Sequence, residues 1–256
     1  MAKIHIGTSG WVYGEWQEIF YPEDLPQREW LEYYSQRFKT VEVNSTFYHQ
    51  MKPSTFSQWR QKVPKDFVFA VKANRFITHI KRLLDCGEPL ERLLEQVKGL
   101  GGKLGPILFQ LPPRWKADTK RLETFLVLCS QFIAHGNKKS VNGEPSTVNR
   151  FVFEFRDVSW LNVEIFKILR NYNTAAVIND SNVFPKTEEI TADFVYIRLH
   201  GPASLYSSEY SKKELAVWSE KIKNWLKTGF DVYAYFNNDV GGYAVKNART
   251  LIQMIS

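Results

Sequence analysis

Eight short β-rich runs along this 256-residue chain end in polar or charged residues, and most of them are followed by a stretch with helical periodicity. The runs end at GTSG (7–10), EVNS (42–45), Lys72, Gln110, EFR (154–156), ND (179–180), RLH (198–200) and NND (237–239). A strand-then-helix unit that occurs eight times is typical of a (β/α)8 barrel, which places its chemistry at the carboxyl ends of its strands. The sequence therefore predicts an α/β fold of the TIM-barrel type with a site at the carboxyl ends of its strands. The pattern does not indicate which reaction takes place there.

The length of the chain fits one such barrel. No Pro/Gly/Ser-rich linker or change in composition divides it, so we predict a single domain over 1–256. The connection between the expected strands at 174–180 and 194–200 contains Pro185 and leaves room for a single helical turn, so the sixth helix is expected to be degenerate. A polar insert at 135–149 is expected at the opposite end of the barrel from the site.

Composition and charge set the expected compartment and partners. The first residues enter a strand directly and no apolar run is long enough to span a membrane, which predicts a cytoplasmic protein with no membrane partner. Cys86 and Cys129 share no metal-binding spacing and suit a reducing compartment. A net charge of +7 favours anionic partners. The lysines and arginines of the chain are spread over both ends of the expected barrel, so the net charge alone is weak evidence for a nucleic-acid partner.

Blocks of sequence along nearly the whole chain resemble the YecE-like family. The blocks, in order, are IGTSGW (6–11), VEVNSTFY (41–48), FAVK (69–72) with TH (78–79), LFQLPP (108–113), EFR (154–156) with SW (159–160), YIRLHG (196–201) and FNND (236–239). The resemblance implies a TIM barrel independently of the periodicity. It implies no particular reaction, so function has to be argued from the strand-end residues.

Alternation along the expected strands predicts which side chains face the mouth of the barrel. In the run 151–156 three phenylalanines share one face and belong outward against the helices, which directs Glu154 and Arg156 inward. The predicted mouth contains Glu42, Asn44, Lys72, Gln110, Glu154, Arg156, Asp180, Arg198 and His200. Ion pairs such as Arg156–Glu154 and Arg198–Asp180 would explain part of this set structurally. Burying so many charges for structure alone is costly, so the set indicates a functional site.

One hypothesis is an enzyme, a hydrolase or lyase, acting on a phosphate-bearing or other anionic substrate. Glu154 and His200 are candidates for proton transfer and Lys72 is a third catalytic candidate. Lys72 would also hold negative charge together with Arg156 and Arg198. The candidate substrate-binding residues are Glu42, Asn44, Gln110, Arg156, Asp180, Arg198, Asn237, Asn238, Gly241, Trp11 and Trp160. TIM barrels commonly hold phosphate at the loops after strands seven and eight, here near Gly241.

A metal-assisted version of this enzyme would use Glu42, Glu154, Asp180 and His200 as ligands for Mg²⁺, Mn²⁺ or Zn²⁺. The chain has five histidines, and only His200 stands at a strand end, which disfavours the metal. No nucleotide-cofactor fingerprint is present.

Three alternatives remain open. Aromatic and cationic residues interleaved in the mouth loops suit a non-catalytic binder of single-stranded nucleic acid; they are Trp11, Trp16, Tyr48, Trp115 and Trp160 beside Arg75, Lys81, Arg82, Arg114 and Lys116. A glycosidase would pair Glu42 with Glu154. A Schiff-base aldolase would use Lys72, provided that its amine is desolvated.

Overall fold

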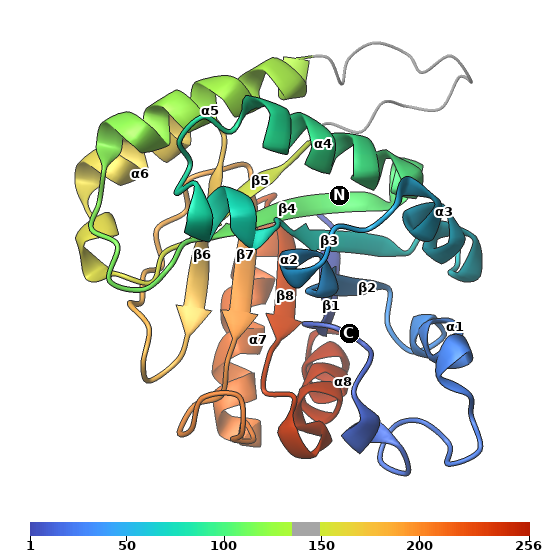
Figure 1. The fold of residues 1–256 in the computed structure, drawn as a ribbon. Helices are drawn as coiled ribbons and strands as arrows, with labels where there is room; N and C mark the ends of the chain where they lie inside the picture. The colour runs from blue at the N-terminus through green and yellow to red at the C-terminus, as the bar shows by residue number, and fades with distance from the viewer. Residues whose placement is uncertain (135–148) are drawn as a thin grey trace.

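Eight parallel strands form a nearly closed barrel in the computed structural model, which describes residues 1–134 and 149–256 (Figure 1). The strands are β1 (Ile4–Thr8), β2 (Thr40–Val43), β3 (Val68–Lys72), β4 (Leu104–Gln110), β5 (Phe151–Glu154), β6 (Ala175–Asp180), β7 (Phe194–Leu199) and β8 (Asp231–Phe236). They confirm the predicted α/β TIM barrel. The expected polar insert lies outside the described residues except for its last position.

The barrel closes where β1 meets β2, and the two strands approach closely there. Every other neighbouring pair forms a parallel ladder, whereas β1 and β2 are joined through a single bridge between Ser9 and Glu42. A side chain at Gly7 would place its Cβ 2.2 Å from the backbone oxygen of Thr40, so only glycine fits. The Tyr34 hydroxyl accepts from the Thr8 N–H and donates to the Thr40 carbonyl, which ties the two strands together.

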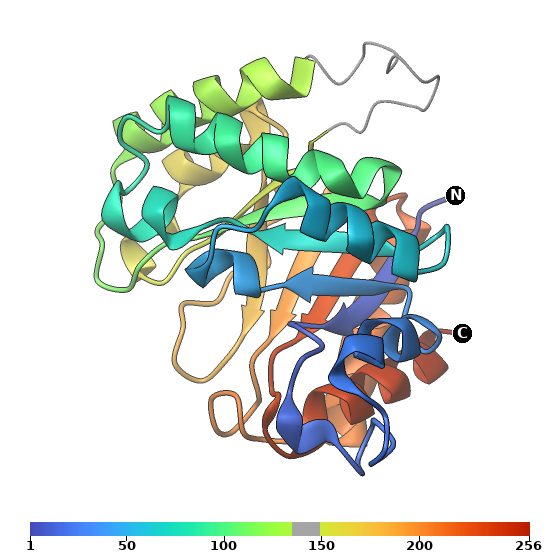
Figure 2. The same ribbon diagram turned by 45° about the vertical axis from the view of Figure 1, so that its right-hand side comes forward.

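Helices surround the barrel, with α3, α4 and α5 along one side and α7 and α8 along another (Figures 1 and 2). The helices are α1 (Trp30–Ser35), α2 (Ser45–Tyr48), α3 (Pro53–Lys62), α4 (Gly87–Val97), α5 (Thr119–Ala134), α6 (Val163–Asn171), α7 (Lys212–Lys227) and α8 (Tyr243–Ile255). The connection from β6 to β7 carries no helix, which confirms the degenerate sixth helix. Among the described residues, none of the helices has the length and apolarity needed to cross a membrane.

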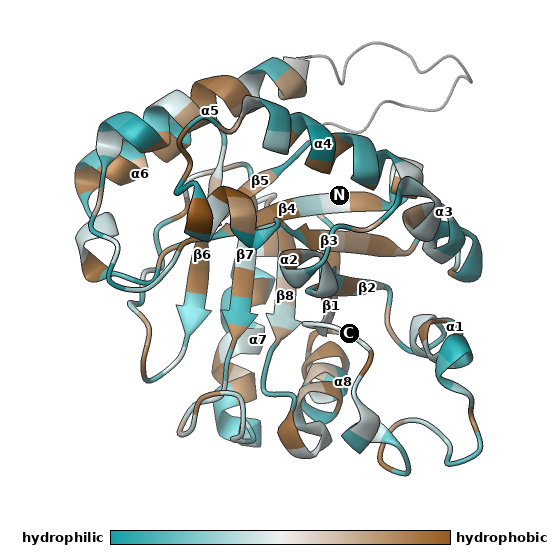
Figure 3. Ribbon diagram, in the orientation of Figure 1, coloured by the Kyte–Doolittle hydropathy of each residue, from teal (hydrophilic) through white to brown (hydrophobic). Residues whose placement is uncertain are grey.

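Side-chain alternation divides the buried residues into two layers. Outward-facing strand residues pack under the helices, and a separate cluster fills the barrel interior. The interior cluster consists of Ala70, Leu108, Val152, Ala175, Val177, Phe194, Tyr196, Tyr233 and Tyr235. Residues two positions further along each strand must also face inward, at its carboxyl end. Figure 3 shows the hydrophilic tips of β6 and β7 at that end.

Candidate functional site

Arg198 lies at the centre of a buried charge network at the carboxyl ends of the strands. Its Nη2 is 2.7 Å from Oε1 of Glu42 on β2, and its Nη1 is 2.8 Å from Oε2 of Glu154 on β5. Nη2 also donates to the Asn237 side-chain oxygen at 3.0 Å. The three charged side chains are at most 1% exposed. One guanidinium thus connects two carboxylates across the barrel.

Both carboxylates are held in the ionised form. Burial acts to raise the pKa of Glu42, but the charge of Arg198 and hydrogen bonds from Arg198, Tyr196 and Ser9 outweigh it and lower the pKa. For Glu154 burial is likewise outweighed, here by the charges of two arginines and a hydrogen bond from His200, so its pKa is well below the usual range. Glu42 and Glu154 therefore each carry a full negative charge at neutral pH.

His200 and Arg156 complete the surroundings of Glu154. The Arg156 Nη2 is 2.7 Å from Glu154 Oε1, which also lies 3.1 Å from Nε2 of His200. Burial lowers the pKa of His200 to about 4, so the ring is neutral at neutral pH. Because Nε2 also lies 3.2 Å from the Asn179 side-chain oxygen, the hydrogen belongs on Nε2 and Nδ1 is an acceptor. All of the Glu154 oxygens are engaged, so this carboxylate is poorly placed to act as a base.

Lys72 ends β3 inside the mouth, and its environment differs from that of the arginines. Its Nζ lies 4.1 Å above the ring of Phe47, which is on α2. Burial, together with the charge of Arg198, lowers the pKa of Lys72 to about 7. Among the described residues no carboxylate forms an ion pair with this amine. A large share of Lys72 is therefore neutral at neutral pH, with an available lone pair.

Aromatic rings border this polar centre on two sides. The ring of Phe47 contacts His79 edge-on at 5.0 Å between centroids. Across the mouth, the guanidinium of Arg156 lies 3.3 Å from the ring centroid of Phe184, which packs edge-on against His200 at 5.4 Å. Lys72 and Arg156 thus each lie on an aromatic face, whereas Arg198 lies between two carboxylates.

Asp239 is a second group with an unusual acidity. Burial raises the pKa of Asp239 to about 7, against a hydrogen bond from Asn237 and the charge of Arg198, which lower it. Its Oδ2 accepts from the Asn237 side chain at 2.9 Å. Among the described residues its buried Oδ1 has no hydrogen-bond partner. The carboxyl can therefore change its charge near neutral pH at the edge of the network.

The structure brings seven of the predicted residues together and places Asp180 elsewhere. The seven are Glu42, Lys72, Glu154, Arg156, Arg198, His200 and Asn237. Asp180 lies on the outer face of β6, where Oδ1 pairs with Lys186 at 3.0 Å and Oδ2 accepts from Trp218 on α7 at 3.0 Å. The expected inward position of Asp180 and its pair with Arg198 are therefore wrong. Because Ala175 and Val177 face inward, it is Asn179 that reaches the mouth.

The predicted metal ligands do not form one set. Asp180 is on the outer face, and Arg198 lies between Glu42 and Glu154. In the two described stretches of the chain, no group of three His, Cys, Asp or Glu side chains is arranged to hold a metal ion.

Two of the predicted substrate-binding side chains have structural positions. Asn238 is buried, and its amide donates to the Ser208 carbonyl and to Asn247 on α8, both at 2.9 Å. Trp160 is fully buried, donates to the Trp115 carbonyl at 2.6 Å and stacks on Phe155. Neither side chain is available to a substrate, so the expected binding roles of Asn238 and Trp160 are not supported by their positions.

The other four predicted residues have different surroundings. Gln110 pairs in register with Glu154 at the end of β4. Gly241 is exposed in the turn before α8, with a φ of 66° that favours glycine. Trp11 and Asn44 line a cavity between the ends of β1 and β2.

Several neighbours of the network escaped the sequence analysis as site residues. Ser9 and Tyr196 both donate to Glu42, at 2.8 and 2.6 Å, and both follow from strand alternation. Strand alternation along β6 also indicates that Asn179 faces inward. Phe184 lies in the connection between β6 and β7, where no periodicity could have indicated its contact with Arg156.

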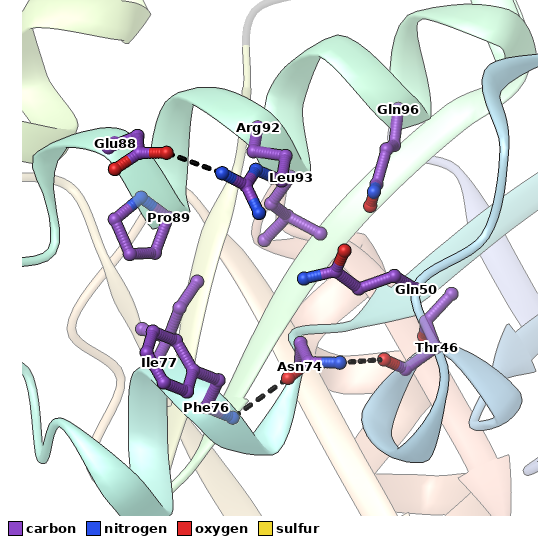
Figure 4. A pocket seen from close by; sticks show the side chains of 10 residues that line it. All are labelled: Thr46, Gln50, Asn74, Phe76, Ile77, Glu88, Pro89, Arg92, Leu93 and Gln96. Atoms are coloured by element: carbon purple, nitrogen blue, oxygen red, sulfur yellow. Dashed lines mark hydrogen bonds and ion pairs between the residues drawn. The ribbon is translucent and has the colours of Figure 1, made fainter.

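A cavity of about 340 Å³ lies beside α2, between the residues that follow β3 and α4 (Figure 4). The side-chain amides of Gln50 and Gln96 point toward one another across it. Asn74 donates to the Thr46 carbonyl at 3.1 Å. The two charged residues of this cavity, Arg92 and Glu88, pair with each other, so it presents mainly neutral amides.

Comparison with known proteins identifies relatives along the whole chain. The family described as "Protein of unknown function DUF72" matches residues 5–256. UPF0759 protein YunF of Bacillus subtilis (strain 168) is 23% identical over 283 residues, covering 98% of this chain and 94% of that protein. UPF0759 protein YecE of Escherichia coli (strain K12) is 29% identical over 242 residues, covering 88% of this chain and 83% of that protein.

Solved structures show the same architecture. A DUF72 family protein from Thermotoga maritima MSB8 superposes with a TM-score of 0.83 at 28% identity, covering 99% of both chains. One from Enterococcus faecalis V583 has a TM-score of 0.80 at 19% identity, covering 98% of this chain and 95% of that one, and supports the fold alone. The resemblance to YecE-like proteins is confirmed, and this chain belongs to the DUF72 family.

Proposed function

We propose that this chain is an enzyme of the lyase type that acts on an anionic carbonyl compound through the amine of Lys72. The observation that carries the proposal is the position of this amine. It is desolvated at the inward end of β3 and lies on the Phe47 ring, and no carboxylate in the described part of the chain pairs with it. A lysine whose pKa is near 7 supplies a neutral nucleophile at neutral pH, as imine-forming enzymes require.

The reaction begins with attack of the Lys72 lone pair on the carbonyl carbon. The C–N bond forms, the carbonyl oxygen takes up two protons and leaves as water, and a protonated imine remains. The protonated imine accepts the electron pair of the bond between the α and β carbons of the substrate as that bond breaks. The β-hydroxyl gives up its proton, its carbon leaves as a second carbonyl compound, and the resulting enamine takes up a proton at the α carbon. Addition of water then restores the carbonyl and the free amine, so Lys72 is regenerated.

The neighbouring residues suit the supporting tasks. Glu42 and Glu154 balance Arg156 and Arg198 in charge, so the network does not repel an anion. Among the described residues Nε of Arg156 is buried without a partner, and it can donate to an anionic substrate group. Within residues 1–134 and 149–256 Nδ1 of His200 has no hydrogen-bond partner, so it can accept a proton. This arrangement favours amine chemistry over hydrolysis by Glu154, whose oxygens are occupied.

Borohydride trapping tests the proposal. Wild-type protein treated with borohydride and pyruvate or glyceraldehyde 3-phosphate should gain the mass of one reduced adduct, located by peptide mapping at Lys72. Lys72→Met should gain none, while Lys65→Met, at an exposed lysine, should label as wild type does. Dihydroxyacetone, which is neutral, should label less than either anion. Labelling confined to exposed lysines would refute a reactive amine at Lys72.

A further inference from the structure

We propose that the cavity between the carboxyl ends of β1 and β2 binds the base of a nucleotide. The cavity measures about 550 Å³, which lies in the usual range of small-molecule pockets. It is separate from the buried charge network, and the inference goes beyond the proposed reaction and does not depend on it.

Aromatic side chains from three segments line this cavity. Trp11 follows β1, Tyr48 is on α2 and Trp59 is on α3. The rings of Trp11 and Trp59 meet edge to face, at 5.1 Å and 89°, while Tyr48 is 66% exposed. The exposed ring of Tyr48 and the partly buried ring of Trp59 offer π-faces on which any nucleobase can stack, whereas Trp11 is 7% exposed and packs against Trp59.

Asn44 supplies the polar contact that a base requires. It lines the cavity, and its buried side-chain oxygen has no hydrogen-bond partner among the described residues. An asparagine amide presents an acceptor and a donor side by side, which matches the edge of adenine. A sugar would need many such partners, and this lining is mostly apolar, so a base fits better than a carbohydrate.

Cationic residues at the cavity suit the phosphate of a nucleotide. Arg28 and Lys62 both line it, and Lys62 donates to the Arg28 carbonyl at 2.8 Å. Glu29 lies 3.4 Å from the Arg28 Nε and offsets one of the two positive charges. The net charge of these three residues is positive. The lining of the cavity in Figure 4 has no net charge from its ionisable residues, because Arg92 and Glu88 pair with each other.

The short helix α2 separates the cavity from Lys72. Phe47 faces the amine of Lys72, whereas its neighbours Ser45 and Tyr48 line the cavity. The rings of Phe47 and Tyr48 meet edge to face at 4.9 Å. A nucleotide held there would lie beside the barrel mouth. A free mononucleotide and the end of a single strand share this chemistry.

Titration of the whole protein with adenosine 5′-monophosphate, followed by tryptophan fluorescence and calorimetry, tests the inference. Wild type should bind it more tightly than adenosine or inorganic phosphate and should not bind glucose. Asn44→Leu should weaken binding by about 10- to 100-fold, because it removes the amide that pairs with the base. Trp59→Leu should also weaken it. Gln96→Leu, in the cavity of Figure 4, is the matched control and should bind as wild type does.

The remaining arms distinguish the source of the ligand and the two proposals. Tighter binding of a tri-adenylate, with steep salt dependence, would identify a strand end, and equal binding would identify a free nucleotide; both support a base site. Lys72→Met should retain binding, so a failure of the lysine chemistry would leave this result intact. Binding of glucose, no binding of the nucleotide, or nucleotide binding unchanged in Asn44→Leu would overturn the inference.

Discussion

Arg198→Met is expected to destabilise the folded protein by about 3–5 kcal/mol at pH 7, the range for a broken buried ion pair. The substitution keeps much of the side-chain volume but leaves Glu42 and Glu154 ionised, almost fully buried and without the guanidinium between them. Urea unfolding measures the change as a shift in midpoint. Arg170→Met, at the exposed pair with Glu189, is the matched control and should change stability by less than about 1 kcal/mol.

The pH dependence of this loss checks its cause. The pKa of each carboxyl is lowered in the fold, so each contributes stability above its ordinary range near 4.5, and that contribution falls as acid protonates the folded state. The gap between wild type and Arg198→Met should therefore be widest at neutral pH and narrow below about pH 4.5. Adding Glu42→Gln to Arg198→Met should recover part of the loss. A gap that does not depend on pH would point to packing instead of charge.

The eight strand-then-helix units predicted the architecture, and strand alternation predicted the inward direction of most of the site. Glu154 and Arg156 could be directed inward because the phenylalanines of the same strand require the apolar side. The same rule, applied to β6 from Ala175 and Val177, selects Asn179. The sequence prediction placed Asp180 inward instead, and its pairing with Lys186 and Trp218 on the outer face shows that this position is wrong.

The pairing of residues across the barrel could not be predicted in this way. Arg198 pairs with Glu42, and these residues are 156 positions apart on strands that are not neighbours in the sheet. Alternation gives a direction for each side chain but no distance across the barrel. Phe184, which lies in a loop, and Trp160, which ends a short 3-10 helix, have no strand alternation, so their packing depends on the tertiary structure.

Lys72→Met is expected to stabilise the protein at pH 7, with a ceiling of about 5 kcal/mol from the depressed pKa. Below pH 7 the folded protein carries the buried ammonium and bears its full desolvation cost. Between pH 7 and 10.5 the unfolded chain binds more protons at this site, so wild-type stability rises with pH. The advantage of Lys72→Met should thus be largest at pH 7 and below and disappear above about pH 10.5, while Lys65→Met should show none of it.

The direction of this effect bears on why a lysine is there. A methionine of similar length would pack against Phe47 without the cost of a buried charge, so the amine at Lys72 lowers stability for some other purpose. If Lys72→Met is more stable than wild type and no longer forms the borohydride adduct, the amine that destabilises the fold is the same group that forms the imine. A Lys72→Met protein that is less stable than wild type at every pH would instead make this lysine a structural residue and remove the physical basis of the reaction.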